Sequence, residues 1–249
     1  MAKVLNVILT HQPAACVAAM IEWWSRHADS AQVLIVAGGR REDFDEIAQA
    51  QKIFADDARL RTMDHQREFQ SYTGVFRDVS AWLAGRDRTH VSFCEYDHLP
   101  LVGDFNEGQL ARLAAEDADV IGHHVQRIDG TSHPHYLCHH SNPEFHRHWE
   151  KITRREDPEV ILSMFGSGSF WTREAFDAVA SHEEPFRIYL EIYLPTLAHH
   201  LGFRVRDLPD QNSFVQVSPD REPELDAVRE AGAWAVHPVK RRWNRARGH

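Results

Sequence analysis

Short apolar segments alternate with amphipathic segments along the first half of the chain. Continuous aliphatic runs predict strands at 4–10, 32–37, 60–63, 90–94 and 119–122, because buried parallel strands lack polar alternation. Apolar residues at helical spacing predict helices over 13–27, 42–52, 72–84 and 107–116. This order predicts an α/β fold, with a mostly parallel sheet and helices on both faces. Ligands of such sheets bind beyond the carboxyl ends of the strands.

The second half of the chain is less regular. Its pattern predicts a helix at 143–155, a Gly/Ser-rich turn into a strand at 165–171, and a helix from the N-cap Thr172 to about Ala180. A helix is also expected over 191–201, but Pro195 is poorly tolerated inside it, so we expect the helix to start afresh near Leu194. A strand at 203–206 follows. No linker divides residues 1–240, which predicts one domain followed by a basic tail at 241–249.

Composition narrows the class of protein. Hydrophobic residues make up 43% of the chain and charged residues 26%, as in ordinary globular domains. The net charge of −9 argues against a nucleic-acid partner, which requires clustered positive charge. The basic cluster at the end of the chain, which starts at Lys240, is either a local phosphate contact or a solvated end. Three scattered cysteines and the absence of a long apolar run predict a cytoplasmic protein without a membrane span.

The triplet Glu95-Tyr96-Asp97 directly follows the predicted strand at 90–94. Side chains two residues apart point the same way if strand geometry persists. Two carboxylates at a strand end form a hard oxygen site suited to Mg²⁺ or Mn²⁺. Such a cation can neutralise a diphosphate and assist its departure.

This strand and triplet resemble the D-x-D motif of the nucleotide-sugar glycosyltransferases of the GT-A fold, with Glu95 in place of the commoner Asp. The resemblance implies that Asp97 binds the metal, with Glu95 as a second ligand or a contact to the donor. The run from Ala235 to Lys240 resembles the late histidine segment of these enzymes. It implies that His237 completes the metal site and that Lys240 contacts the diphosphate.

The same resemblance extends to two further segments. The small-residue turn Gly166-Ser167-Gly168 resembles the segment beside the donor sugar, and Glu191 matches the general base at a helix start. The alternative for Glu191 is a solvated acid that the helix dipole favours. The residues implied to contact the nucleotide are Thr10, His11, Gly38, Gln70, Tyr72 and Glu95.

The resemblance implies a GT-A (Rossmann-like) domain over residues 1–240, with a nucleotide-sugar-binding half at 1–125 and an acceptor-side half at 126–240. It predicts a metal-dependent glycosyltransferase that moves a sugar from a nucleoside-diphosphate donor, foremost a UDP-sugar, to an acceptor hydroxyl, with inversion. The cofactor expected is Mn²⁺ or Mg²⁺. A non-catalytic nucleotide-binding protein of the same fold is an alternative.

A second alternative comes from the histidines between His123 and His148. The chain has 18 histidines, and the pairs at 133/135 and 146/148 could each supply two zinc ligands to a metal-dependent hydrolase. No HExxH motif is present. A solvated, acceptor-facing loop explains the cluster equally well. The members are His123, His124, His133, His135, His139, His140, His146 and His148.

Overall fold

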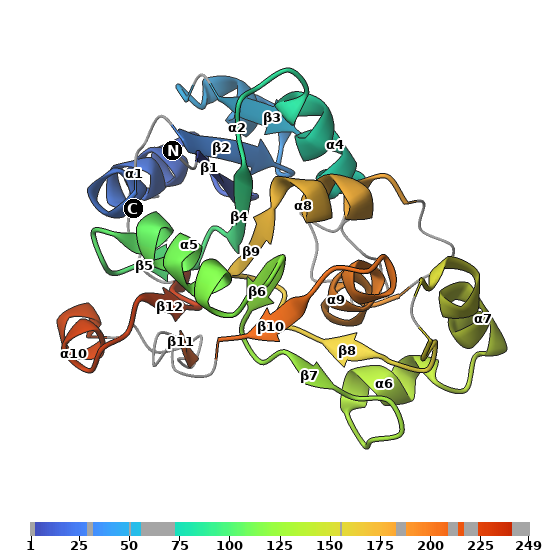
Figure 1. The fold of residues 1–249 in the computed structure, drawn as a ribbon. Coiled ribbons are helices and arrows are strands. Elements are labelled where there is room, and N and C mark those ends of the chain that lie inside the picture. The colour runs from blue at the N-terminus through green and yellow to red at the C-terminus, as the bar shows by residue number, and fades with distance from the viewer. Residues whose placement is uncertain are drawn as a thin grey trace.

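A seven-stranded sheet forms the centre of the molecule (Figure 1). The computed structural model describes residues 3–28, 32–49, 51–55, 73–154, 156–182, 188–208, 214–216 and 224–240. The strand order is β10-β6-β9-β4-β1-β2-β3, and β9 alone among these runs antiparallel to its neighbours. The bounds are β1 Val4–Thr10, β2 Val33–Ala37, β3 Lys52–Phe54, β4 His90–Glu95, β6 Val120–Gly122, β9 Ser169–Thr172 and β10 Val205–Asp207. The predicted mostly parallel α/β sheet is confirmed.

Helices cover both faces of this sheet, as expected (Figure 1). Side chains alternate along β1, so that Leu5 and Val7 join one apolar core while Ile8 joins the other. In the first core, Phe76 stacks on Phe176 with ring centroids 4.4 Å apart. That core contains α4 (Thr73–Leu83), α7 (Pro143–Ile152), α8 (Arg173–Ala180) and α9 (Leu190–His200). The second contains α1 (Ala14–His27) and the start of α5 (Phe105–Ala115).

The register of the central strands brings several loops to one edge of the sheet. Thr10 pairs with Ala37 and Leu9 with Glu95, so β1, β2 and β4 end together. The antiparallel strand β9 begins at this edge, because Ser169 pairs with Phe93. Loops that are distant in the sequence therefore meet there, as expected for a site at the carboxyl ends of parallel strands.

A small second sheet, which the sequence pattern did not predict, carries the end of the described chain back to this edge. Its strands are β5 (Leu99–Pro100), β11 (Phe214–Gln216) and β12 (Ala235–His237), and α10 (Leu225–Glu230) precedes β12. Figure 1 shows β12 beside β5, with which it pairs antiparallel through Val236 and Leu99. The indole of Trp23 donates a hydrogen bond to the Pro100 carbonyl oxygen at 2.7 Å, which ties this sheet to α1.

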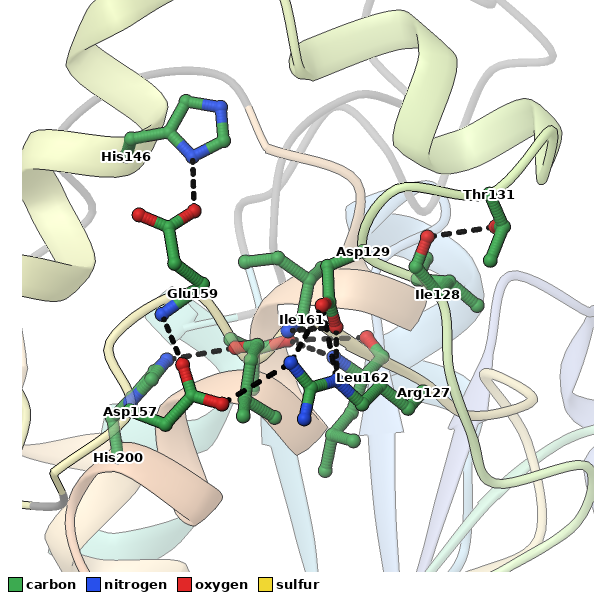
Figure 2. Close-up of polar contacts among 12 residues, drawn as sticks. Arg127, Ile128, Asp129, Thr131, His146, Asp157, Glu159, Ile161, Leu162 and His200 are labelled. Atoms are coloured by element: carbon green, nitrogen blue, oxygen red, sulfur yellow. Dashed lines mark hydrogen bonds and ion pairs between the residues drawn. The ribbon is translucent and has the colours of Figure 1, made fainter.

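The remaining elements are α6 (Pro134–His139) and the two-stranded sheet of β7 (Gln126–Arg127) and β8 (Leu162–Ser163). Polar contacts hold this part together (Figure 2). The Asp129 carboxylate accepts hydrogen bonds from the Arg127 guanidinium and from the Ile161 amide at 3.1 Å. Thr196 of α9 is fully buried, and its hydroxyl binds both the amide and the carbonyl of Leu162. These bonds fix β8 against α9.

One predicted helix is shorter in the structure than expected. The helix expected over 42–52 is α2 (Arg41–Glu46), and Lys52 begins β3 instead. Here the Lys52 ammonium binds the carbonyl oxygens of Phe44 and Ile47, which lie at the end of the helix. The strand expected at 60–63 lies outside the described residues.

The helix α9 runs unbroken from Leu190 through Pro195, so the fresh start expected near Leu194 is wrong. Pro195 has no amide hydrogen and leaves the Glu191 carbonyl oxygen without its usual helical partner. The amide of Met164 donates to that oxygen at 2.9 Å. A neighbouring segment thus compensates for the proline.

The three cysteines are all free, and Cys138 is the exposed one. No helix in the described ranges is both long and apolar enough to cross a bilayer. The division into halves at 1–125 and 126–240 stays a prediction, and the tail at 241–249 lies outside the described residues.

Candidate active site and metal centre

The acidic triplet lies where β4 gives way to a turn. The strand ends at Glu95, and the amide of His98 donates to the Glu95 carbonyl oxygen at 3.0 Å. Strand alternation therefore does not carry through the triplet. Asp97 is buried, with a side chain only 2% exposed, whereas the Glu95 side chain is 36% exposed. The two carboxylates approach each other through the turn rather than through a shared strand face.

His237 reaches this turn from the small second sheet. Val236 pairs with Leu99, and the Val239 amide donates to the Asp97 carbonyl oxygen at 2.9 Å. His237 Nε2 lies 3.2 Å from Asp97 Oδ1 and 3.5 Å from Glu95 Oε2. The sequence resemblance paired these three residues, and the structure brings them together.

Glu95, Asp97 and His237 offer three possible ligand atoms within 4.8 Å of one another. Among the described residues this is the one such group of three or more metal-binding side chains. Asp97 Oδ1 is buried and lies 3.2 Å from His237 Nε2. Two carboxylates with one imidazole form a donor set that fits a divalent cation such as Mn²⁺.

The local charges agree with a cation site. Burial lowers the pKa of His237, but Asp97 and Glu95 outweigh it and raise the pKa to about 9. The two carboxylates therefore hold a positive charge between them, which is a proton on the imidazole in the metal-free protein. Lys240 Nζ lies 4.0 Å from Asp97 Oδ2, at the edge of the same group.

The small-residue turn supports the triplet from the β9 side. Ser167 Oγ accepts a hydrogen bond from the Glu95 amide at 2.9 Å and lies 3.3 Å from His98 Nδ1. The Gly168 amide donates to the Phe93 carbonyl oxygen at 3.0 Å. Gly168 has φ +85°, and a Cβ there would overlap the buried ring of His98. Only glycine fits this backbone position without strain.

Glu191 lies on the other side of the same turn, in the first turn of α9. Its Oε1 accepts a hydrogen bond from the Gly166 amide at 3.1 Å, and its Oε2 lies 3.2 Å from His135 Nδ1. The pKa of Glu191 is raised to about 7, mainly by burial and to a lesser extent by the charge of Glu95. The Gly166 amide and His237 act in the opposite direction. A carboxyl group that titrates near neutral pH is suited to proton transfer.

Three of the residues predicted to contact the nucleotide, Thr10, His11 and Gly38, lie at the ends of β1 and β2. Thr10 is buried, and its hydroxyl accepts a hydrogen bond from the Gln12 amide at 3.0 Å. The exposed ring of His11 packs edge-on against Tyr96, with ring centroids 4.8 Å apart. The Gly38 amide donates to the Thr10 carbonyl oxygen at 2.9 Å. Gln70 and Tyr72 lie outside the described residues, and nucleotide contact by all five residues stays a prediction.

The histidines between His123 and His148 are spread over several surroundings. His123 lies beside His98, with ring centroids 6.0 Å apart. His148 stacks on Tyr193 and His140 on Tyr136. Within the described residues none of the eight belongs to a group of three metal-binding side chains. Sequence reasoning missed that His135, from one of the two H-x-H pairs, contacts Glu191.

No protein-family model matches this sequence. No curated protein matches it either. Similar solved structures include a mannosyltransferase from Pyrobaculum calidifontis in complex with GDP-Man and Mn²⁺, at 10% identity and a TM-score of 0.46, covering 84% of this chain. This chain spans 55% of the length of that protein.

Two further solved structures show a comparable likeness. Core-mannan synthase A from Aspergillus fumigatus, in its Mn/GDP form, is 7% identical with a TM-score of 0.42, covering 84% of this chain and 73% of that one. A 4-diphosphocytidyl-2C-methyl-D-erythritol synthase is 11% identical with a TM-score of 0.42, covering 83% and 88%. These are distant likenesses of fold, and the side chains of the site carry the functional proposal.

Proposed function

We propose that this chain is a metal-dependent glycosyltransferase that moves a sugar from a nucleoside-diphosphate donor to an acceptor hydroxyl, with inversion. One observation carries the proposal. The ligand atoms of Glu95, Asp97 and His237 gather within 4.8 Å at the carboxyl edge of the sheet. Gly166 and Ser167, which are adjacent in the chain, connect this group to Glu191 by hydrogen bonds.

Glu95, Asp97 and His237 would hold Mn²⁺ or Mg²⁺. When bound, the cation would neutralise negative charge on the diphosphate of the donor and so favour its departure. Lys240 lies beside Asp97 and is suited to contact the diphosphate as a point charge. Thr10, His11 and Gly38 would contact the nucleoside, for which uridine is the first expectation.

Glu191 would act as the general base. Its carboxylate accepts the proton of the acceptor hydroxyl while the acceptor oxygen forms a bond to the anomeric carbon. The bond from that carbon to the diphosphate oxygen breaks, and the electron pair leaves with the diphosphate. Attack opposite the leaving group inverts the anomeric centre. A pKa of about 7 leaves much of Glu191 ionised at neutral pH, where it can still accept the proton.

Asp97→Asn tests the metal site, because it keeps the side-chain shape and removes the charge. We expect the affinity for Mn²⁺, measured by calorimetric titration of the metal-free protein, to fall at least about tenfold. Asp104→Asn is the matched control, because Asp104 is exposed and its side chain does not cap α5. An unchanged Mn²⁺ affinity in Asp97→Asn would remove Asp97 from the site.

The donor is tested separately. UDP-, GDP-, CDP- and dTDP-sugars are compared with and without Mn²⁺. The true donor, for which a UDP-sugar is the first expectation, should raise the melting temperature only with Mn²⁺ present, since a ligand of the native state stabilises it. Metal-dependent binding with neither transfer nor hydrolysis of the donor would favour the non-catalytic alternative. Tightly held zinc that His133→Ala or His146→Ala removes would favour the hydrolase alternative.

A further inference from the structure

The short helix α6 contacts the start of α9 through two histidines one turn apart. His135 and His139 share a helix face at this spacing. His139 is buried, and its Nε2 accepts a hydrogen bond from the Tyr189 amide at 3.3 Å. The His135 ring lies against the Tyr189 ring, with centroids 4.2 Å apart. Tyr189 is the N-cap residue of α9, so α6 fixes the helix start two residues before Glu191.

Each oxygen of the Glu191 carboxyl group has a different neighbour. The Gly166 amide donates to Oε1 at 3.1 Å, and His135 Nδ1 lies 3.2 Å from Oε2. The first partner is backbone and is present whatever the side chains are. The second is a side chain on another helix, and it is the one that a substitution can remove.

His135 is neutral at physiological pH. Burial, with a smaller effect of the neighbouring His133 and His139, lowers its pKa to about 4. A neutral imidazole carries one proton, and the nitrogen that faces a carboxylate is the favoured place for it. In the structure Nδ1 is buried and makes no hydrogen bond with the described residues, and Oε2 lies 3.2 Å away as an acceptor within its reach.

We propose that His135 is a positioning residue for Glu191, whose ring turns so that Nδ1–H donates a hydrogen bond to Oε2 and aims the carboxylate at the acceptor side of the site. The catalytic importance of His135 rests on the function proposed above. The charged groups that act on Glu191 are Glu95, which favours protonation, and His237, which favours ionisation. A hydrogen bond from His135 would favour ionisation of Glu191, because a carboxylate accepts it more strongly than a protonated carboxyl group does.

Three variants distinguish a hydrogen bond donated by His135 from packing of its ring against Tyr189. His135→Phe keeps a ring against Tyr189 and loses the donor. His135→Asn loses the ring, but its side-chain amide places a donor where Nδ1 lies. His140→Phe is the control, because His140 is exposed at the end of the same helix and contacts Tyr136 and Leu137.

The readout is the pKa of the Glu191 carboxyl, followed by carbon NMR in metal-free protein and assigned by its loss in Glu191→Gln. We expect His135→Phe to raise this pKa by about 1, as for loss of one hydrogen bond to a charged group. His135→Asn should leave it at or below the wild-type value, since donor and added solvent both favour ionisation. His140→Phe should not change it.

An unchanged pKa in His135→Phe, or equal rises in the Phe and Asn variants, would overturn the proposal. Should His135→Phe fail to fold, His135→Leu gives the same comparison with a smaller apolar cover. The NMR result does not need activity, so it stands even if no donor is transferred. With an active enzyme, kcat should fall about fivefold at pH 7 in His135→Phe, because a pKa raised by about 1 lowers the ionised fraction of Glu191 by that factor, with the KM for the donor unchanged.

Discussion

Gly168→Ala should destabilise the protein strongly, because the residue combines two constraints. Its φ of +85° lies in the left-handed region, which L side chains rarely adopt. A Cβ at this position would overlap His98 Cε1 and lie 3.0 Å from His123 Cδ2. Both rings are buried, His98 at 0% and His123 at 3% exposure, so neither can turn toward solvent to make room.

The loss in the free energy of unfolding follows from these two constraints. The left-handed backbone costs about 1–2 kcal/mol for a residue with a Cβ. Overpacking against rigid neighbours adds about 1–3 kcal/mol. The melting temperature of a chain of this size should fall by about 4–20 °C, at roughly 2–4 °C for each kcal/mol. The displaced His98 should also disturb Ser167 and through it Glu95, so the affinity for Mn²⁺ should fall as well.

Gly85→Ala separates the two terms. Gly85 also has a positive φ, of +71°, but nothing lies within 4 Å of a Cβ there. Thermal unfolding followed by circular dichroism should show a loss in this variant that matches the backbone cost alone, with unchanged Mn²⁺ affinity. Equal losses of melting temperature in the two variants would refute the claim that His98 and His123 leave no room at Gly168.

Three more predictions concern α9. Because burial raises the pKa of Glu191 to about 7, transfer should fall about tenfold for each pH unit below that value, and a rate profile that is flat from pH 5 to 7 would exclude Glu191 as the base. Since the folded pKa lies above the ordinary 4.5, protonated Glu191 stabilises the fold fully below pH 4.5 and this contribution is lost as pH rises through 7; urea unfolding of Glu191→Gln should lack that dependence. Thr196→Val leaves the amide and carbonyl of Leu162 without their partner and should cost about 2–4 kcal/mol in urea unfolding, whereas Thr196→Ser should cost far less.

Local patterns predicted the part of the fold that local physics determines. The aliphatic runs of β1, β2 and β4 match predicted strands within a residue or two, because each strand is buried on both faces. Once those strands are parallel, their carboxyl ends must meet, and the position of Glu95 and Asp97 follows. The triplet could therefore be placed at an edge of the sheet before any coordinates.

Pairings between remote segments could not be predicted in this way. The strand β12 has three residues, and its antiparallel register with β5 sets where His237 lies. Only the resemblance to a family motif linked His237 to Asp97 in advance. The end of α2 also depends on a contact between separate elements, because the ammonium of Lys52, the first residue of the next strand, binds carbonyl oxygens there. Such contacts depend on tertiary structure, which overrides helix propensity over 42–52.

For Glu191, the sequence alone does not distinguish a catalytic residue from a solvated one. An acid in the first turn of a helix is favoured by the helix dipole whether or not it takes part in chemistry. What separates the two cases is burial, and the burial of Glu191 comes from elsewhere in the chain. Gly166 contacts one oxygen from the turn before β9, and His135 contacts the other from α6. The Gly166 amide is backbone and cannot be removed by a substitution, whereas the His135 side chain can, so variants of His135 test how this carboxyl group is held.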